Sequence, residues 1–283
     1  MLSTVEPWVG PYRDSVDGLV VTGGAGLNVV ANQALRNSFG LDVFVNVAPN
    51  DCGLGLGLVR QVAIARQSDR PVALKPAPVT YLGFPTWDEE DLRSRVERHE
   101  AVLLRGVEGR RELARLLVEE GAIVGVVRGR QEVGPRALGH RSLLGFPDTT
   151  AARDRMNRLK ARQWYRPVAP VVPRESLHDF FEDAGDSPYM SFAPRLKKEA
   201  ADRFPAITHV DGTARVQSVT SEEEGWLHDL LRWVGLLSGG WPILMNTSFN
   251  TKVHPHPHLT MPRPHTSPGH ACKRPITCRA VHW

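Results

Sequence analysis

The amino-acid sequence predicts an α/β chain in two parts, of which the second is of the α+β type. Between 18 and 70, two short apolar runs are each followed by a turn and a stretch of helical periodicity, which is typical of layered α/β units. A proline-rich, weakly patterned stretch at 71–87 predicts a linker. From 88 to 250, helices and strands follow one another without regular alternation, and this order favours an α+β domain.

The first part begins with "GLVV" at 18–21, which we interpret as a short buried strand. A glycine-rich turn then leads into a helix that ends at Gly40. A second strand, "DVFVNVAP" at 42–49, leads through another turn into a second helix at 51–67. Residues 1–17 show no periodicity, so we expect a loop there.

The second part begins with two amphipathic helices, at 88–100 and 110–121, followed by a buried strand at 122–127. Another helix begins at a capping side chain, Asp148 or Thr149. The remaining expected elements are strands at 168–172, 208–219 and 242–248 and helices near 175–183 and 222–237.

Composition limits the function classes. The 283 residues carry a formal net charge of +4, which fits anionic ligands without requiring nucleic acid. Three cysteines, Cys52, Cys272 and Cys278, are too few for a disulfide framework, so we expect a reducing cytoplasm. No apolar stretch reaches the length of a signal peptide or a membrane span, which predicts no membrane partner.

The segment "GRQEVGPRALGHRS" at 129–142 holds three arginines, a histidine and three glycines. Guanidinium groups bind phosphate through parallel hydrogen bonds, and glycines let the main chain approach an anion. A second basic set follows in "RLKARQWYRP", with Lys160, Arg162 and Arg166. Singly, such residues are usually solvated surface cations. Together, between buried strands, they predict a site for a small, highly charged anion.

At this point the sequence resembles a known family. "GRQEVGPRALGHRSLL", "RMNRLKARQWYRPVAPVV", "SPYMSF", "THVDGTARVQSV" and "PILMNTSFN" are similar, in order and spacing, to the carboxy-terminal domain of the O-carbamoyltransferases of antibiotic and nodulation-factor biosynthesis. Upstream, "VVTGGAGLNVVANQAL" and "VAPNDCGLGLGL" resemble the end of that family's first domain. The resemblance covers about 18 to 250.

The resemblance implies the remnant of an actin-like ATPase-type domain at 18–70 and a YrdC-like domain at 88–250. It implies ATP and carbamoyl phosphate as ligands, from which the YrdC-like domain forms carbamoyl-adenylate. The actin-like domain would then transfer the carbamoyl group to an alcohol oxygen, helped by a divalent metal, iron in the family. The arginines would neutralise charge on the phosphates as bonds break. The acceptor alcohol is not specified by the sequence.

For contacts with the donor and the nucleotide we expect Arg130, Arg136 and Arg215 first. Further candidates for substrate contacts are Arg141, Ser142, Arg166, His209, Asp211 and Asn246. A local hydrogen-bonded pair that fixes the strand explains His209 and Asp211 equally well. Glu132, surrounded by cations, should stay ionised and orient an arginine.

In the first part, Gly23, Gly24 and Asn28 lie where a helix N-terminus can receive phosphate or ribose groups, so we expect nucleotide contacts there. Asp51 matches the family's metal-binding aspartate, although an ordinary helix cap explains it as well. The two histidines that complete the family's metal site, spaced H-x-x-x-H, have no counterpart in the matching region. We therefore expect an incomplete metal site.

Residues 251–283 contain no Asp or Glu and hold six of the eleven histidines, and they show no periodicity. This predicts a disordered tail. Because the resemblance begins inside the family's first domain and stops at this tail, our hypothesis is a truncated chain with a frameshifted end, which sequencing of the locus would test. The partial domain at 18–70 would then expose apolar strand edges, leaving open a homo-oligomer or a missing N-terminal portion as its cover.

Two other functions stay open. YrdC-like domains can bind RNA, but we see no interleaved basic and aromatic stretch of the kind that stacks bases, so nucleic acid is disfavoured. A degenerate, non-catalytic partner protein is the second alternative. For the chain alone we expect binding of the carbamoyl donor to be retained more readily than transfer.

Overall fold

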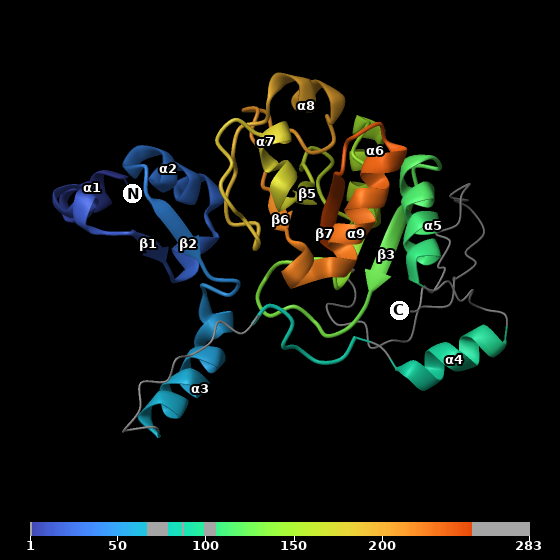
Figure 1. Ribbon diagram of the computed structural model, residues 1–283, viewed down its shortest axis with the longest axis horizontal. Coiled ribbons are helices and arrows are strands. Elements are labelled where there is room, and N and C mark those ends of the chain that lie inside the picture. Colours follow the sequence, from blue (N-terminus) through green and yellow to red (C-terminus); the bar gives the residue numbers. More distant parts are fainter. Residues whose placement is uncertain (1, 67–78, 87, 99–105, 251–283) are drawn as a thin grey trace.

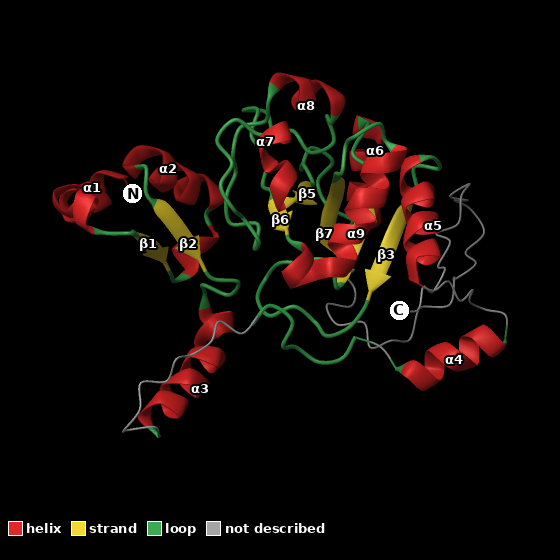
Figure 2. Cartoon of the chain, viewed as in Figure 1, coloured by secondary structure: helices red, strands yellow, loops and turns green. Residues whose placement is uncertain are grey.

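The computed structural model describes residues 2–66, 79–86, 88–98 and 106–250, and these form an α/β fold with two separate sheets. Figure 1 shows a small N-terminal unit, in blue, beside a larger body that contains the five-stranded sheet. Figure 2 shows how helices and long loops surround both sheets. The predicted α/β class is confirmed.

The N-terminal unit is built on two parallel strands, β1 (Gly18–Val21) and β2 (Asp42–Val45). Its helices are α1 (Leu2–Val9), α2 (Val29–Phe39) and α3 (Leu54–Ala65), and α3 extends away from the rest of the unit (Figure 1). The strands and the last two helices lie where the apolar runs and turns predict them.

Local sequence explains the bounds of α2. The Asn28 side chain accepts a hydrogen bond from the N–H of Ala31 at 3.1 Å, which caps the first turn. At the other end Gly40 adopts φ 62° and donates to the carbonyl of Arg36 at 2.9 Å, a conformation that favours glycine. The predicted end of this helix at Gly40 is confirmed.

The expectation of a loop at 1–17 is wrong. Helix α1 is followed by a 3-10 helix at Gly10–Ser15, so most of this segment is helical. Val5 and Val9 pack against a cluster that includes Leu35 and Phe39, and this tertiary contact supports a helix that the local sequence does not announce.

The larger body contains a five-stranded mixed sheet with the order β3-β4-β7-β5-β6. All neighbours are antiparallel except β5 and β6. The strands are β3 (Ile123–Val127), β4 (Arg141–Gly145), β5 (Ala169–Pro173), β6 (Gln217–Val219) and β7 (Leu244–Ser248). Strand β4 begins inside the segment expected to be a loop, and only the end of the predicted strand at 208–219 forms β6.

Helices pack on this sheet and enclose the main core. The long helix α9 (Ser221–Leu237) lies beside α5 (Gly106–Val118), and both contact the sheet (Figure 1). The other helices are α4 (Glu89–Glu97), α6 (Thr150–Leu159), α7 (Leu177–Phe180) and α8 (Lys198–Arg203). Thr149 caps α6, because its hydroxyl accepts a hydrogen bond from the N–H of Ala152 at 3.2 Å. Of the two predicted caps, Asp148 and Thr149, the second is therefore the one that forms.

Residues 79–86, here called the strap, pack along the segment that follows β3. The N–H of Gly83 donates to the carbonyl of Gln131 at 3.0 Å, and the N–H of Gln131 donates to that of Phe84 at 2.9 Å. The strap is the described portion of the predicted linker. Residues 71–78 and 87 of that linker, like the predicted tail at 251–283, lie outside the described residues.

The N-terminal unit presents apolar side chains to solvent. Val20 on β1 is 76% exposed and Phe44 on β2 is 55% exposed, and α3 presents Leu58 and Val59 in the same way. Such a surface agrees with the expectation that this part exposes apolar strand residues. None of the helices among the residues that the structure describes is both long enough and apolar enough to cross a membrane.

Candidate functional site

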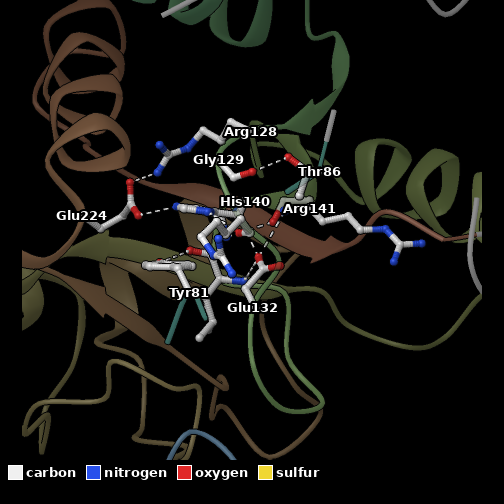
Figure 3. Close-up of polar contacts among 12 residues, drawn as sticks. Tyr81, Thr86, Arg128, Gly129, Glu132, His140, Arg141 and Glu224 are labelled. Carbon is white, nitrogen blue, oxygen red and sulfur yellow. Dashed lines mark hydrogen bonds and ion pairs between the residues drawn. The ribbon is translucent and has the colours of Figure 1, made fainter. Parts of the chain in front are cut away.

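The arginine loop, residues 128–140, connects β3 to β4 and is held from inside by one carboxylate (Figure 3). Oε1 of Glu132 accepts from the backbone N–H groups of Leu138 and His140, each at 2.9 Å, and of Arg141 at 3.1 Å. The hydroxyl of Ser142 accepts from the N–H of Gly139 at 3.0 Å. Glu132 therefore fixes the backbone of the loop rather than orienting an arginine side chain as expected.

Buried amides hold the other side of the loop. Nδ2 of Asn246 donates to the carbonyl of Ala137 and to Oε1 of Gln217, each at 3.0 Å. Nε2 of Gln217 in turn donates to the carbonyl of Leu138 at 3.0 Å. Since Asn246 and Gln217 are almost completely buried, these bonds tie the loop to β7 and β6.

A second group of buried polar side chains lies at the base of the loop (Figure 3). Glu224 accepts from Nη2 of Arg128, and its other oxygen lies 2.9 Å from Nε2 of His140. The Tyr81 ring stacks on the His140 ring with centroids 3.6 Å apart, and its hydroxyl donates to the carbonyl of Leu138 at 3.2 Å. Burial, aided by Arg128, lowers the pKa of His140 to about 4.

Positive side chains from several segments of the larger body lie close enough to affect one another's charge. Burial, followed by the positive charges of Arg136, Arg162 and Arg166, lowers the pKa of Arg215 to about 9. Burial, followed by the charges of Arg162 and Arg141, lowers the pKa of Lys160 to about 8. We call these six residues the cation cluster: Arg136, Arg141, Lys160, Arg162, Arg166 and Arg215.

Two donors in the cation cluster are buried without a hydrogen-bond partner. Within the described part of the chain, Nη2 of Arg162 and Nε of Arg215 have none. A buried donor without a partner is costly, and so is the mutual repulsion of guanidinium groups. An anion placed among these side chains would relieve both costs, so the arrangement is typical of a site for a phosphate-bearing ligand.

The segment that carries Lys160, Arg162 and Arg166 is itself fixed. The side chain of Asn157, which is 1% exposed, donates to the carbonyls of Trp164 and Arg166 at 2.8 Å each and accepts from Nε of Arg162 at 2.5 Å. Nζ of Lys160 donates to the carbonyl of Asn250 at 2.9 Å. The cations are therefore positioned before any ligand binds.

Comparison with known proteins identifies the family of the chain. Residues 114–261 match the family described as "Carbamoyltransferase C-terminus". The chain belongs to this family. The matching range contains the whole cation cluster, and the resemblance inferred from the sequence motifs is confirmed.

Curated relatives of the family extend over most of the chain. "Nodulation protein NolNO" of Sinorhizobium fredii is 33% identical over 249 residues, covering 84% of this chain and 35% of that protein. "Nodulation protein U" of Azorhizobium caulinodans is 35% identical over 240 residues, covering 84% of this chain and 40% of that protein. The "3'-hydroxymethylcephem-O-carbamoyltransferase" of Streptomyces clavuligerus is 37% identical over 233 residues, covering 82% of this chain and 42% of that protein. The chain thus spans about two fifths of the length of these relatives.

Among the residues expected to contact the donor, Arg136 and Arg215 lie in the cation cluster with Arg141 and Arg166. Arg130 lies elsewhere, because its exposed side chain points to the strap and its Nη2 is 3.4 Å from the carbonyl of Leu82. Ser142 and Asn246 support the loop backbone and not the cluster directly.

His209 and Asp211 form a local hydrogen-bonded turn. Both bind Thr213: Nδ1 of His209 lies 2.9 Å from its hydroxyl, and Oδ1 of Asp211 accepts from that hydroxyl at 2.7 Å. Local hydrogen bonding that fixes this segment therefore accounts for the contacts of His209 and Asp211. His209 is still close enough to Arg215 for the positive charge to lower its pKa, after the larger effect of burial.

The residues of the N-terminal unit that are expected to contact nucleotide and metal are exposed, and these roles stay predictions. Gly23 and Gly24 are exposed at the turn after β1, and the Asn28 side chain caps α2. Asp51 is exposed at the start of a 3-10 helix, Asp51–Gly53. No group of three or more His, Cys, Asp or Glu side chains that could hold a metal ion occurs among the described residues.

Sequence reasoning missed the residues at the base of the loop. Tyr81 lies in the proline-rich stretch taken for a linker, and Glu224 lies in the acidic start of α9, where a solvated side chain is the usual interpretation. Arg128 and Gln217 carry no local signal either. Only His140, inside the arginine-rich motif, could have been found from its position.

Proposed function

We propose that this chain binds carbamoyl phosphate and ATP at the cation cluster and forms carbamoyl-adenylate for O-carbamoylation of a small-molecule alcohol. The observation that carries the proposal is the convergence of these cations, of which two have a buried guanidinium donor with no partner among the described residues. Membership of the carbamoyltransferase family and the name of the cephem relative support the reaction class and the alcohol acceptor.

In the proposed reaction, the side chains of the cation cluster stabilise negative charge on the phosphate groups. Water first hydrolyses carbamoyl phosphate to carbamate and inorganic phosphate. A carbamate oxygen then attacks the α-phosphorus of ATP and displaces pyrophosphate, which forms carbamoyl-adenylate. Guanidinium groups that are already in place stabilise the charge on the departing phosphates without reorganisation. No side-chain nucleophile is needed, because the ligands supply both reacting groups. We further propose that the larger body is YrdC-like and the N-terminal unit actin-like.

A ligand that binds only the folded protein should raise its stability. We expect carbamoyl phosphate and ATP each to raise the free energy of unfolding by about 2.7 kcal/mol at a hundredfold excess over the dissociation constant. Differential scanning calorimetry measures this gain, and release of pyrophosphate in the presence of both ligands measures turnover. If neither ligand changes the melting temperature, the proposal is wrong and a non-catalytic partner protein is favoured.

The affinity for carbamoyl phosphate should depend on pH through Lys160. Its pKa, lowered from 10.5 to about 8, means that the ammonium group loses its charge as the pH rises from 7 to 9. We expect the dissociation constant to rise over this interval in titration calorimetry. In Lys160→Met the remaining pH dependence should be flatter. An identical profile in the two proteins would contradict the assignment.

The stability of the ligand-free protein should rise with pH, whereas its affinity for carbamoyl phosphate should fall. Between pH 8 and 10.5 unfolded Lys160 holds a proton that the folded form has lost, so stability increases with pH there. Weaker binding together with a higher melting temperature would exclude alkaline unfolding as the cause.

One observation favours RNA as a second candidate. Trp164 and Tyr165 are 70% and 62% exposed between Arg162 and Arg166, so this stretch does interleave basic and aromatic residues, contrary to the expectation from sequence. Exposed rings beside cations can stack bases. A salt-sensitive gel shift with RNA that carbamoyl phosphate does not compete away would favour this function.

A further inference from the structure

We propose that Glu224 is a positioning residue for the arginine loop: by holding Arg128 and His140 with one carboxylate, it sets the placement of Arg136. This inference rests on the proposed donor binding at the cation cluster. Arg128 and His140 are the two ends of the loop, and Arg136 lies between them near the tip. A carboxylate that binds both ends therefore closes the loop at its base.

The contacts at the base involve both backbone and side chains. The N–H of Arg128 donates to the carbonyl of His140 at 2.9 Å, and Glu224 joins the two side chains above this bond (Figure 3). The other ring nitrogen of His140 lies 2.7 Å from the carbonyl of Arg130, and Tyr81 covers the ring face. The imidazole is thus restrained on its two polar edges and on one face.

Glu224 interrupts the regular backbone of α9 and has a buried side chain. Glu224 has φ −146° and ψ 61°, values outside the helical region, although α9 continues to Leu237. The Glu224 side chain is only 7% exposed, and its described partners there are the two ends of the loop.

The hydrogen bonds define which substitution preserves the arrangement. A carbonyl only accepts, so Nδ1 of His140 carries a proton toward Arg130. The contact between Nε2 and the carboxyl group then needs one further proton, held by either partner. Glutamine supplies an N–H at this position and keeps an oxygen for Arg128, whereas alanine supplies neither.

The chain offers a matched control on the same helix. His228 of α9 lies 2.7 Å, by its Nε2, from Oε1 of Glu175, so a second histidine–glutamate pair exists that does not touch the arginine loop. Glu175→Ala therefore removes the same kind of contact from α9 and leaves the loop contacts in place.

The test measures binding of carbamoyl phosphate by titration calorimetry to the full chain and to Glu224→Ala, Glu224→Gln and Glu175→Ala. We expect the dissociation constant to rise at least about tenfold in Glu224→Ala and to stay within about threefold of the original in the other two. Unchanged binding in Glu224→Ala, or an equal loss in Glu175→Ala, would overturn the inference. If Glu224→Ala does not fold, Tyr81→Leu takes its place, with the same expected loss.

A second measurement needs no ligand. Amide hydrogen exchange of peptides covering 132–141 should become faster in Glu224→Ala than in Glu175→Ala, because the base of the loop is open. Unchanged exchange there contradicts positioning by Glu224. If the unaltered chain fails to bind carbamoyl phosphate but the exchange result holds, the proposed function is wrong and the positioning of the loop stands.

Discussion

Arg215→Met is expected to weaken binding of carbamoyl phosphate by about a hundredfold and to raise the melting temperature of the ligand-free protein. A charged hydrogen bond to a buried group is worth up to about 3 kcal/mol, which corresponds to roughly this factor. The higher melting temperature follows from repulsion. Arg136, Arg162 and Arg166 all oppose the charge of Arg215, and methionine fills similar space without that charge.

Titration calorimetry and a thermal melt test both halves of this prediction. Arg93→Met is the matched control, because Arg93 is exposed on α4, a helix that carries no member of the cation cluster. We expect this variant to bind like the original chain. A loss of affinity accompanied by a lower melting temperature in Arg215→Met would show that Arg215 stabilises the fold and not the ligand.

Phe204→Ala is expected to lower the free energy of unfolding by about 3–5 kcal/mol. Phe204 is 0% exposed, and its ring lies 5.9 Å from that of Phe146, 6.2 Å from that of Phe180 and 5.4 Å from that of Trp241, measured between centroids. Alanine leaves a cavity among three other aromatic rings, which cannot collapse without moving α7 and the two loop segments that carry them.

The same substitution at an exposed ring gives the comparison. Phe44, on β2, is 55% exposed, so Phe44→Ala removes little buried surface and should change the stability by less than about 0.5 kcal/mol. Chemical denaturation of both variants measures the difference. Equal losses would mean that Phe44 is covered in solution, by a second copy or by another partner.

The sequence predicts much of the fold because its elements follow local rules. Gly40 ends α2, Thr149 begins α6, and the apolar run at 122–127 contains β3. Elements that depend on distant contacts were missed. Helix α1 contains Pro7 and is held by packing on α2, and β4 follows directly on a glycine-rich loop.

The sequence predicts which charged residues belong to the site, but not how their side chains are arranged in space. The basic motifs identify Arg136, Arg166 and Arg215, and these do converge. The same reasoning selects Arg130, whose side chain turns toward the strap, because residue type carries no information on direction. Glu224 and Tyr81 reach the loop only through tertiary structure, from 84 residues later and from the strap.

The position of β7 bears on how the protein is made. This strand is the last of those in the described residues, yet it lies in the middle of the sheet, between β4 and β5. A chain emerging from the ribosome therefore cannot join the two halves of its sheet until about residue 248 has been synthesised. A nascent chain that stalls earlier has no Asn246 to donate to the carbonyl of Ala137, so the arginine loop is secured only after β7 has been synthesised.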